Sequence, residues 1–151
     1  MKSLFKEIFV YHHHFNQKLG EQIIMNEQQV SEKILFLFSH VILSQQVWNA
    51  RILGRNTMDL NQTLELSECL NLDKFNFALT DKIIEEMKLN KYISYSNSKG
   101  QKFRNSVVDI LFHLSNHSTH HKGQIVAELR RGGIDPVITD YIFSKRVEEI
   151  L

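Results

Sequence analysis

Apolar side chains recur every three or four residues along most of this chain, which is the spacing of amphipathic helices. The pattern predicts helices over residues 3–25, 28–54, 67–89 and 105–131. Residues 34–38 are apolar on nearly all sides, which indicates that the second helix is central and well buried. A single proline and six glycines leave few breaks in these helices.

The segments between and after the helices carry turn signals. Residues 92–103 alternate apolar and polar positions around an Asn-Ser-Lys-Gly sequence, which predicts a short hairpin or turn before the fourth helix. Gly132 and Gly133 mark the end of that helix, and Asp135 with Pro136 predicts the start of a short C-terminal helix. We therefore expect an all-α four-helix bundle, with another all-α packing of the same helices as the alternative.

Composition narrows the class of protein. The 151 residues include 18 basic and 17 acidic side chains, so a formal net charge of +1 gives no positive field to attract nucleic acid or an anionic membrane surface. No apolar run is long enough for a secretory signal or a membrane span. Cys69 is the only cysteine, which excludes an intrachain disulfide and fits a reducing compartment. We expect one cytoplasmic domain over residues 1–151, with Cys69 as a small core residue and not a nucleophile.

Histidine is the residue type that points to chemistry, because the chain has eight and four of them lie within residues 113–121. Residues four apart on an α-helix lie on one face. His113 with His117, and His117 with His121, are therefore candidate chelating pairs, and His117 with His120 is a weaker one. The apolar stripe of this helix passes closest to His117 and His121, which favours these two as inward-pointing ligands.

The second helix offers a third candidate ligand, His40. Zinc-type catalytic sites usually use three protein ligands and keep one position open. A buried imidazole needs a hydrogen-bond partner or a metal, so His40 is either a satisfied core histidine or the partner of His117 and His121. The histidine triplet at residues 12–14 cannot act as one clamp, because consecutive helical residues point about 100° apart. We expect the triplet to be mostly solvated, with one member reaching the mouth of the site.

Residues 116–125 read NHSTHHKGQI and closely resemble the NH-x-x-HH-(R/K)-GQ-(I/V) motif of the DinB/YfiT-like family. The second helix resembles the family's H…W…R…G pattern through His40, Trp48, Arg51 and Gly54. A weaker match in the first helix consists of Tyr11 with Asn16. Two positions depart from the family pattern, since Gln45 replaces a common glutamate and His14 replaces a common aromatic residue.

This resemblance implies a four-helix bundle with a metal site on its inner faces, whose ligands would be His40, His117 and His121. Similar proteins often form homodimers and bind nickel or zinc, with iron and manganese as further divalent candidates. Characterised relatives include thiol S-transferases that use bacillithiol or mycothiol and a mycothiol-dependent isomerase. Many members of the family have no known activity.

The leading hypothesis is a metal-dependent enzyme acting on a small molecule, either thiol S-transferase-like with a low-molecular-weight thiol, or hydrolase-like. A metal held by three neutral imidazoles keeps its charge and an open position, so it lowers the pKa of a thiol or water beside it. Tyr11, Asn16 and Gln124 are candidate contacts to the substrate or to the metal ligands, with ordinary packing as the alternative. The competing hypotheses are a non-catalytic, dimeric metal-binding or stress-response scaffold, and a vestigial site.

Overall fold

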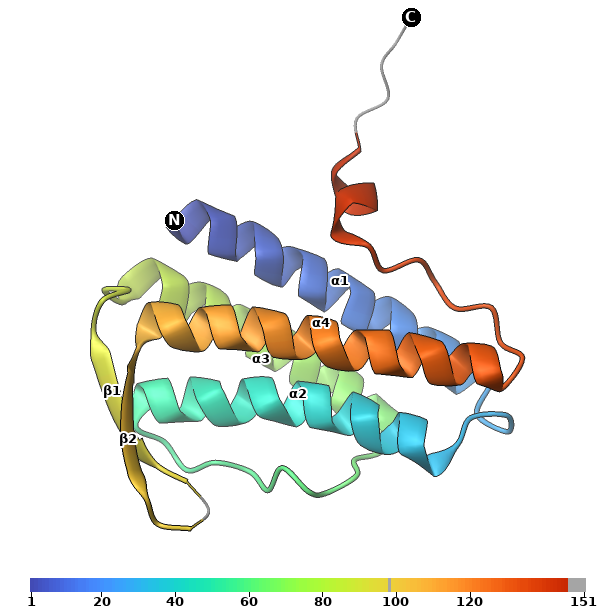
Figure 1. Cartoon of the computed structure of the whole chain (residues 1–151), viewed down its shortest axis with the longest axis horizontal. Helices are drawn as coiled ribbons and strands as arrows, with labels where there is room; N and C mark the ends of the chain where they lie inside the picture. Colours follow the sequence, from blue (N-terminus) through green and yellow to red (C-terminus); the bar gives the residue numbers. More distant parts are fainter. Residues whose placement is uncertain (98, 147–151) are drawn as a thin grey trace, which may run out of the picture.

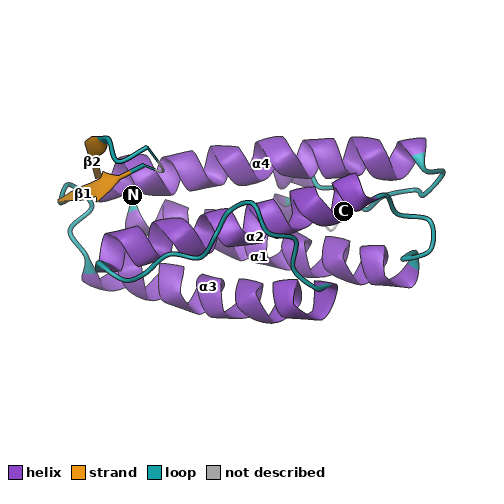
Figure 2. Ribbon diagram, turned by 90° about the horizontal axis from the view of Figure 1, so that it is seen from below, coloured by secondary structure: helices purple, strands orange, loops and turns teal. Residues whose placement is uncertain are grey.

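The computed structural model describes residues 1–97 and 99–146, and this part of the chain is mostly helical. Within it, four long helices lie side by side, with a two-stranded hairpin at one end (Figures 1 and 2). The elements in chain order are α1 (Lys2–Met25), α2 (Glu32–Leu53), α3 (Leu66–Glu86), β1 (Tyr92–Ser96), β2 (Lys102–Ser106), α4 (Val107–Arg131) and a 3-10 helix, η1 (Tyr141–Lys145). The predicted all-α class holds in outline, with the hairpin as a small two-stranded sheet beside the helices.

The ends of α2 are set by the local backbone. The helix begins at Glu32, four residues later than predicted, because residues 26–29 form a turn and Ser31 is an extended N-cap. It ends at Gly54, where a φ of 65° gives the left-handed cap that glycine adopts without strain. The predicted stop at this glycine is confirmed.

The predicted hairpin is confirmed as an antiparallel pair of strands, with Tyr92 opposite Ser106 at its base. Because β2 runs on to Ser106, α4 begins at Val107, two residues later than predicted. Ser106 and Asp109 then exchange hydrogen bonds in a capping box that satisfies the backbone amides of both residues. The second strand therefore leads directly into the helix that carries four of the histidines.

The prediction of a helix starting at Asp135 and Pro136 is wrong. Residues 134–140 form no helix, and in the described residues after them, 141–146, the one helical element is the short η1. The Gln22 side chain donates to the carbonyl of Asp135 at 2.7 Å and accepts from the amide of Val137 at 3.2 Å. The bond to the Asp135 carbonyl occupies an acceptor that the first turn of a helix would have used. The segment stays non-helical along the bundle (Figure 1).

The core lies between the four helices. α1 packs on α3, α2 packs on α3 and α4, and α4 also borders α1. α2 buries the largest share of its side chains, thirteen of 22 residues against nine of 25 in α4, which confirms it as the central element. In the part of the chain that the structure describes, no helix combines the length and the apolarity needed to cross a membrane.

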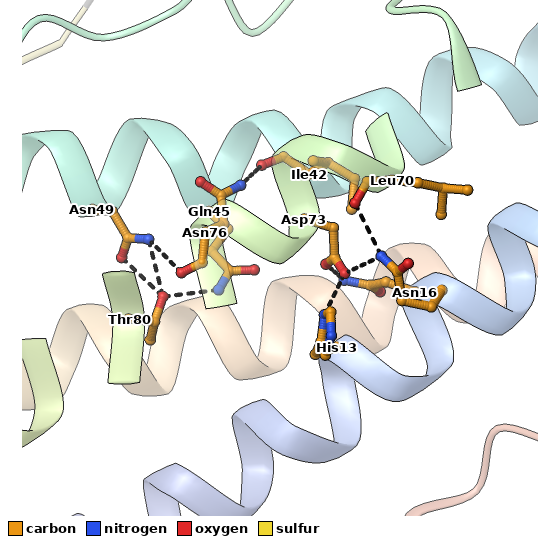
Figure 3. Close-up of polar contacts among 10 residues, drawn as sticks. His13, Asn16, Ile42, Gln45, Asn49, Leu70, Asp73, Asn76 and Thr80 are labelled. Atoms are coloured by element: carbon orange, nitrogen blue, oxygen red, sulfur yellow. Dashed lines mark hydrogen bonds and ion pairs between the residues drawn. The ribbon is translucent and has the colours of Figure 1, made fainter. Parts of the chain in front are cut away.

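A polar contact joins α1 to α3 inside the bundle. The carboxylate of Asp73, 1% exposed, lies 2.5 Å from His13 Nδ1 and accepts from Asn16 Nδ2 at 2.7 Å (Figure 3). Gln17 Nε2 donates to the same carboxylate at 2.7 Å. Buried carboxylates are tolerated when they are fully hydrogen-bonded, so this contact fixes the register of the two helices.

A second polar contact joins α2 to α3. Thr80 Oγ1 accepts from Asn49 Nδ2 at 2.9 Å and from Gln45 Nε2 at 2.8 Å, and it donates to Asn49 Oδ1 at 3.1 Å (Figure 3). Asn76 Nδ2 donates to the carbonyl of Ile42 at 2.9 Å. The side-chain amide of Gln45, the residue that departs from the family pattern, therefore forms a hydrogen bond between α2 and α3.

Candidate metal centre

Three histidines from two helices meet at the interface between α2 and α4. His40 comes from α2, and His117 and His121 lie one turn apart on α4. The Nε2 atoms of His40 and His117 are 3.2 Å apart. The ring centre of His121 lies 4.4 Å from the ring centre of His117 and 4.9 Å from that of His40. One ring nitrogen from each residue lies within 4.8 Å of the other two. All three predicted ligands are thus brought together.

The geometry of the cluster follows from helix packing. Residues four apart stack on one helix face, which places the rings of His117 and His121 side by side. His40 reaches them because α2 packs on α4, and its ring stacks on Phe36, one turn earlier in α2, at 6.0 Å and 19°. The three side chains are half-buried, so a small ligand can reach them from solvent.

Two histidines of the cluster, His117 and His121, are held in the neutral form that metal binding requires. Burial, followed by the neighbouring histidines, lowers the pKa of His117 to about 3. Burial also lowers the pKa of His121. A neutral imidazole has a free lone pair and a protonated one does not. At neutral pH these two rings are therefore able to act as ligands.

Hydrogen bonds orient two of the three rings. His121 Nδ1 lies 2.7 Å from Gln124 Oε1, an atom that only accepts, so Nδ1 carries the proton and Nε2 is free. His40 Nδ1 faces the carbonyl oxygen of Leu60 at 3.5 Å, which favours the same tautomer. Metal-binding histidines in proteins are characteristically oriented through their second nitrogen in this way.

The donor set fits a divalent metal ion. Zinc–nitrogen bonds of about 2.0–2.1 Å in tetrahedral geometry separate two ligand nitrogens by about 3.3 Å, close to the 3.2 Å between His40 Nε2 and His117 Nε2. Three neutral nitrogen ligands suit zinc, nickel and iron better than magnesium or calcium, which prefer oxygen. Three ligands also leave a position for water or substrate.

The other predicted site residues are divided by the fold. Gln124 lies against His121, as described. Tyr11 instead donates its hydroxyl proton to the carbonyl of Thr139, and Asn16 donates to Asp73. Roles for Tyr11 and Asn16 beside the histidine cluster gain no support from these contacts.

The expectation that residues 12–14 are mostly solvated is wrong for two of the three. His12 is 3% exposed, because it faces α4 across the interior, and His13 is half-buried against Asp73. His14 alone of the triplet is exposed. The expectation that the three rings point in different directions is confirmed, since each has its own surroundings. Cys69 is fully buried, as predicted, and burial raises the pKa of its thiol.

Sequence reasoning missed a buried lysine on α4. Lys122 is 2% exposed, and its Nζ lies 2.8 Å from His12 Nδ1. Burial lowers the pKa of Lys122 to about 7, and burial with the nearby ammonium lowers that of His12 to about 2. The signal was present, because Lys122 lies four residues after Ser118 and three before Ile125, both on the buried face of α4.

A groove of about 430 Å³ opens beside His40, between α2, residues 57–61 and the end of the hairpin. Arg51 lines it from the same face of α2 as His40, since eleven residues make slightly more than three turns. The guanidinium lies 4.5 Å from the ring centre of Trp48 and 4.8 Å from that of Tyr95. Among the described residues, Arg51 takes part in no ion pair with a carboxylate.

Comparison with known proteins places the chain in a family. The sequence model of the DinB family matches residues 15–150. The chain is 28% identical over 148 residues to Protein DinB of Bacillus subtilis (strain 168). The aligned region covers 88% of this chain and 86% of the relative. No solved structure matches it. Because the family model spans most of the sequence, including the helix with two of the clustered histidines, the chain belongs to the DinB family.

Proposed function

We propose that this protein is a divalent-metal-dependent enzyme acting on a small molecule, with His40, His117 and His121 as the metal ligands. The observation that carries the proposal is the convergence of one nitrogen from each histidine within 4.8 Å. A thiol S-transferase-like or hydrolase-like reaction suits such a site. Nickel or zinc is the expected ion, with iron and manganese as the alternatives.

When bound, the cation would supply the positive charge that favours the anionic form of a thiol or water beside it. The chain supplies the rest of the site. Gln124 and the Leu60 carbonyl hold His121 and His40 in the tautomer with Nε2 free. Because the imidazoles are neutral, they add no negative charge that would oppose ionisation of the nucleophile.

The groove beside His40 supports an anionic substrate or thiol. Arg51 is the cation of this groove, and the rings of Trp48 and Tyr95 hold its guanidinium in place. A guanidinium binds a carboxylate through two parallel hydrogen bonds. We therefore propose that Arg51 positions a carboxylate of the substrate while the reacting group lies at the histidine cluster.

Metal content tests the ligand assignment. Untagged protein and the His117→Ala/His121→Ala variant are loaded with nickel, zinc, manganese or iron(II), desalted and analysed by elemental analysis. We expect close to one ion per chain in the parent and a small fraction of that in the variant. His113→Ala/His120→Ala is the matched control, because it removes two exposed histidines of the same helix and should retain the metal. A parent that stays empty with every ion contradicts the proposal.

Turnover tests the catalytic half of the proposal. The metal-loaded protein is assayed with low-molecular-weight thiols and model electrophiles, with and without a carboxylate on the electrophile. We expect Arg51→Met to raise KM about tenfold for the carboxylate-bearing electrophile only. Arg55→Met, at an exposed position just after α2, should leave both KM values unchanged.

A non-catalytic, dimeric metal-binding scaffold is the second candidate. It is favoured by the large apolar side chains exposed beyond α4, with Ile138 at 62%, Ile142 at 63% and Phe143 at 40% exposure. Where such side chains form one patch, the patch is typical of a protein interface. Bound metal without turnover of any thiol or ester, together with a dimer mass in light scattering, would favour this candidate over the enzyme.

A further inference from the structure

A cavity of about 440 Å³ lies between α1, α4 and residues 139–141. Its inner wall is buried, since Tyr11, His12 and Lys122 are 8%, 3% and 2% exposed. Its rim includes the exposed side chains of Leu4 and Tyr141. The cavity therefore has a polar inner end and a more apolar mouth, which is the usual construction of a small-molecule site.

Lys122 presents a buried ammonium group to this cavity with few partners. Its Nζ lies 2.8 Å from His12 Nδ1 and 4.7 Å from the ring centre of Tyr11. An ammonium has three N–H donors. Within the described residues, His12 is the one hydrogen-bond acceptor that Nζ reaches, and no carboxylate lies within ion-pair distance of it. A buried charge in this position is stabilised by a further acceptor, ideally an anion.

The neighbours of Lys122 are already committed to other bonds. His12 Nε2 faces Ser115 Oγ at 3.4 Å, and His12 Nδ1 accepts from the lysine. The hydroxyl of Tyr11 donates to the carbonyl of Thr139, and this bond attaches residues 139–141, which form one wall of the cavity, to α1. Neither side chain carries a negative charge, so an anion that balances the charged form of Lys122 would enter through the cavity.

We propose that this cavity binds a small amphipathic carboxylic acid, with its carboxylate at Lys122 Nζ and its apolar chain along Leu4, Ile8 and Tyr141. One ammonium at the inner end balances one negative charge. Asp140 at the rim repels a second anionic group on the same ligand. A monocarboxylate with an apolar tail fits this arrangement better than a phosphate or a dicarboxylate.

The cavity is separate from the histidine cluster. Lys122 follows His117 by five residues, which places it about 140° around α4 from that ligand. A void between His12 and His117 measures about 10 Å³, too small for more than a single water. The inference therefore stands independently of the proposed metal-dependent reaction.

Calorimetry on the full chain tests the inference, with octanoate as the probe and 1-octanol and octylammonium as neutral and cationic controls of equal length. We expect saturable binding of octanoate, and at least tenfold weaker binding of both controls. The same titration on His117→Ala/His121→Ala should give an affinity within twofold of the parent. Loss of octanoate binding in that variant would place the carboxylate at the histidine cluster and overturn the inference.

Variants of the cavity complete the test. Lys122→Met keeps the apolar stem and removes the charge, and it should weaken octanoate binding at least tenfold. Lys18→Met, at an exposed lysine of α1, is the matched control and should leave the affinity unchanged. Leu4→Asp, at an exposed rim position, should also weaken octanoate binding about tenfold, and it keeps the inference testable if Lys122→Met fails to fold. Equal binding of octanoate and 1-octanol, no binding of octanoate, or parent-like affinity in folded Lys122→Met would overturn the proposal.

Discussion

The position of one proton on His121 decides whether this side chain can bind a metal. Gln124 Oε1 accepts from Nδ1 at 2.7 Å and so leaves Nε2 free. The exposed His120 lies on the other side of the same glutamine, with its Nε2 3.3 Å from Gln124 Nε2. Two adjacent histidines of one motif thus have different chemistry, because only one of them faces α2.

Removing this orienting bond should weaken metal binding. We expect Gln124→Met to reduce affinity for the preferred ion about tenfold, the lower end of the range for such supporting residues. Competition with a chromophoric chelator measures the affinity. Ala127→Met, which adds an exposed methionine elsewhere on α4, is the control. Unchanged affinity in Gln124→Met would show that the glutamine does not orient the ligand.

His12 should make the stability of the fold dependent on pH. Burial, followed by the ammonium of Lys122 on α4, lowers its pKa to about 2. The unfolded chain binds the proton near pH 6.5 and the folded chain does not, so stability is complete above pH 6.5 and falls as the pH drops below it. Each histidine of this kind contributes a slope of up to about 1.4 kcal/mol per pH unit.

The substitution His12→Gln isolates this contribution, because glutamine does not titrate and its carbonyl oxygen can still accept from Lys122. We expect the slope of unfolding free energy against pH, measured by urea denaturation between pH 6 and 4, to fall by about 1 kcal/mol per pH unit. His14→Gln, at the exposed member of the triplet, should retain the parent slope. An unchanged slope in His12→Gln would contradict the assignment.

At the scale of elements, α1 and α3 are joined by a buried polar contact as well as by apolar packing. Asp73 is 1% exposed and its carboxylate oxygens accept from Asn16 and Gln17 and contact His13. Removing a buried acceptor leaves its donors unsatisfied, which is more costly than the bonds themselves. The register of α1 against α3 therefore depends strongly on this one carboxylate.

We expect Asp73→Ala to reduce the free energy of unfolding by about 2–4 kcal/mol, since it leaves buried hydrogen-bond donors of α1 without an acceptor. Chemical denaturation monitored by circular dichroism measures the change. Asp81→Ala is the matched control on the same helix: its carboxylate is 42% exposed and pairs with Lys6 at 3.4 Å, so we expect a loss below about 1 kcal/mol. An equal loss of unfolding free energy in both variants would show that the buried contact of Asp73 stabilises the fold no more than the exposed ion pair of Asp81.

At the scale of the whole molecule, the histidine cluster joins α2 to α4. His40 and His117 lie 77 residues apart in the sequence. An ion that binds the folded cluster and not the unfolded chain stabilises the fold by mass action. At a free concentration one hundred times Kd, the gain is about 2.7 kcal/mol. For a domain of this length, that corresponds to a rise in Tm of about 5–10 °C.

Thermal unfolding with increasing nickel or zinc checks this coupling. The parent should show the rise in Tm, and His117→Ala/His121→Ala should show none. His113→Ala/His120→Ala should respond as the parent does. A rise of equal size in all three proteins would mean that the ion binds elsewhere on the chain.

The helices could be predicted because their signal is local. The three- and four-residue spacing of apolar side chains located all four helices to within a few residues. Gly54 marked the end of α2, because glycine adopts the left-handed φ of a helix C-cap without strain. The region after α4 could not be predicted in the same way. Asp135 and Pro136 suit a helix start, but hydrogen bonds from Gln22, more than one hundred residues earlier, hold the segment in another conformation.

The sequence by itself determined the helices, the pairing of His117 with His121 on one face and the family, because helical spacing and a contiguous motif are properties of neighbouring residues. The family resemblance implied His40 as a third ligand, but only the tertiary structure shows that its ring meets the other two. Only the tertiary structure shows that His12 and Lys122 are buried together and that a cavity lies beside them. Those contacts join residues 77 and 110 positions apart. They depend on how the helices pack, which the spacing along any one helix does not specify.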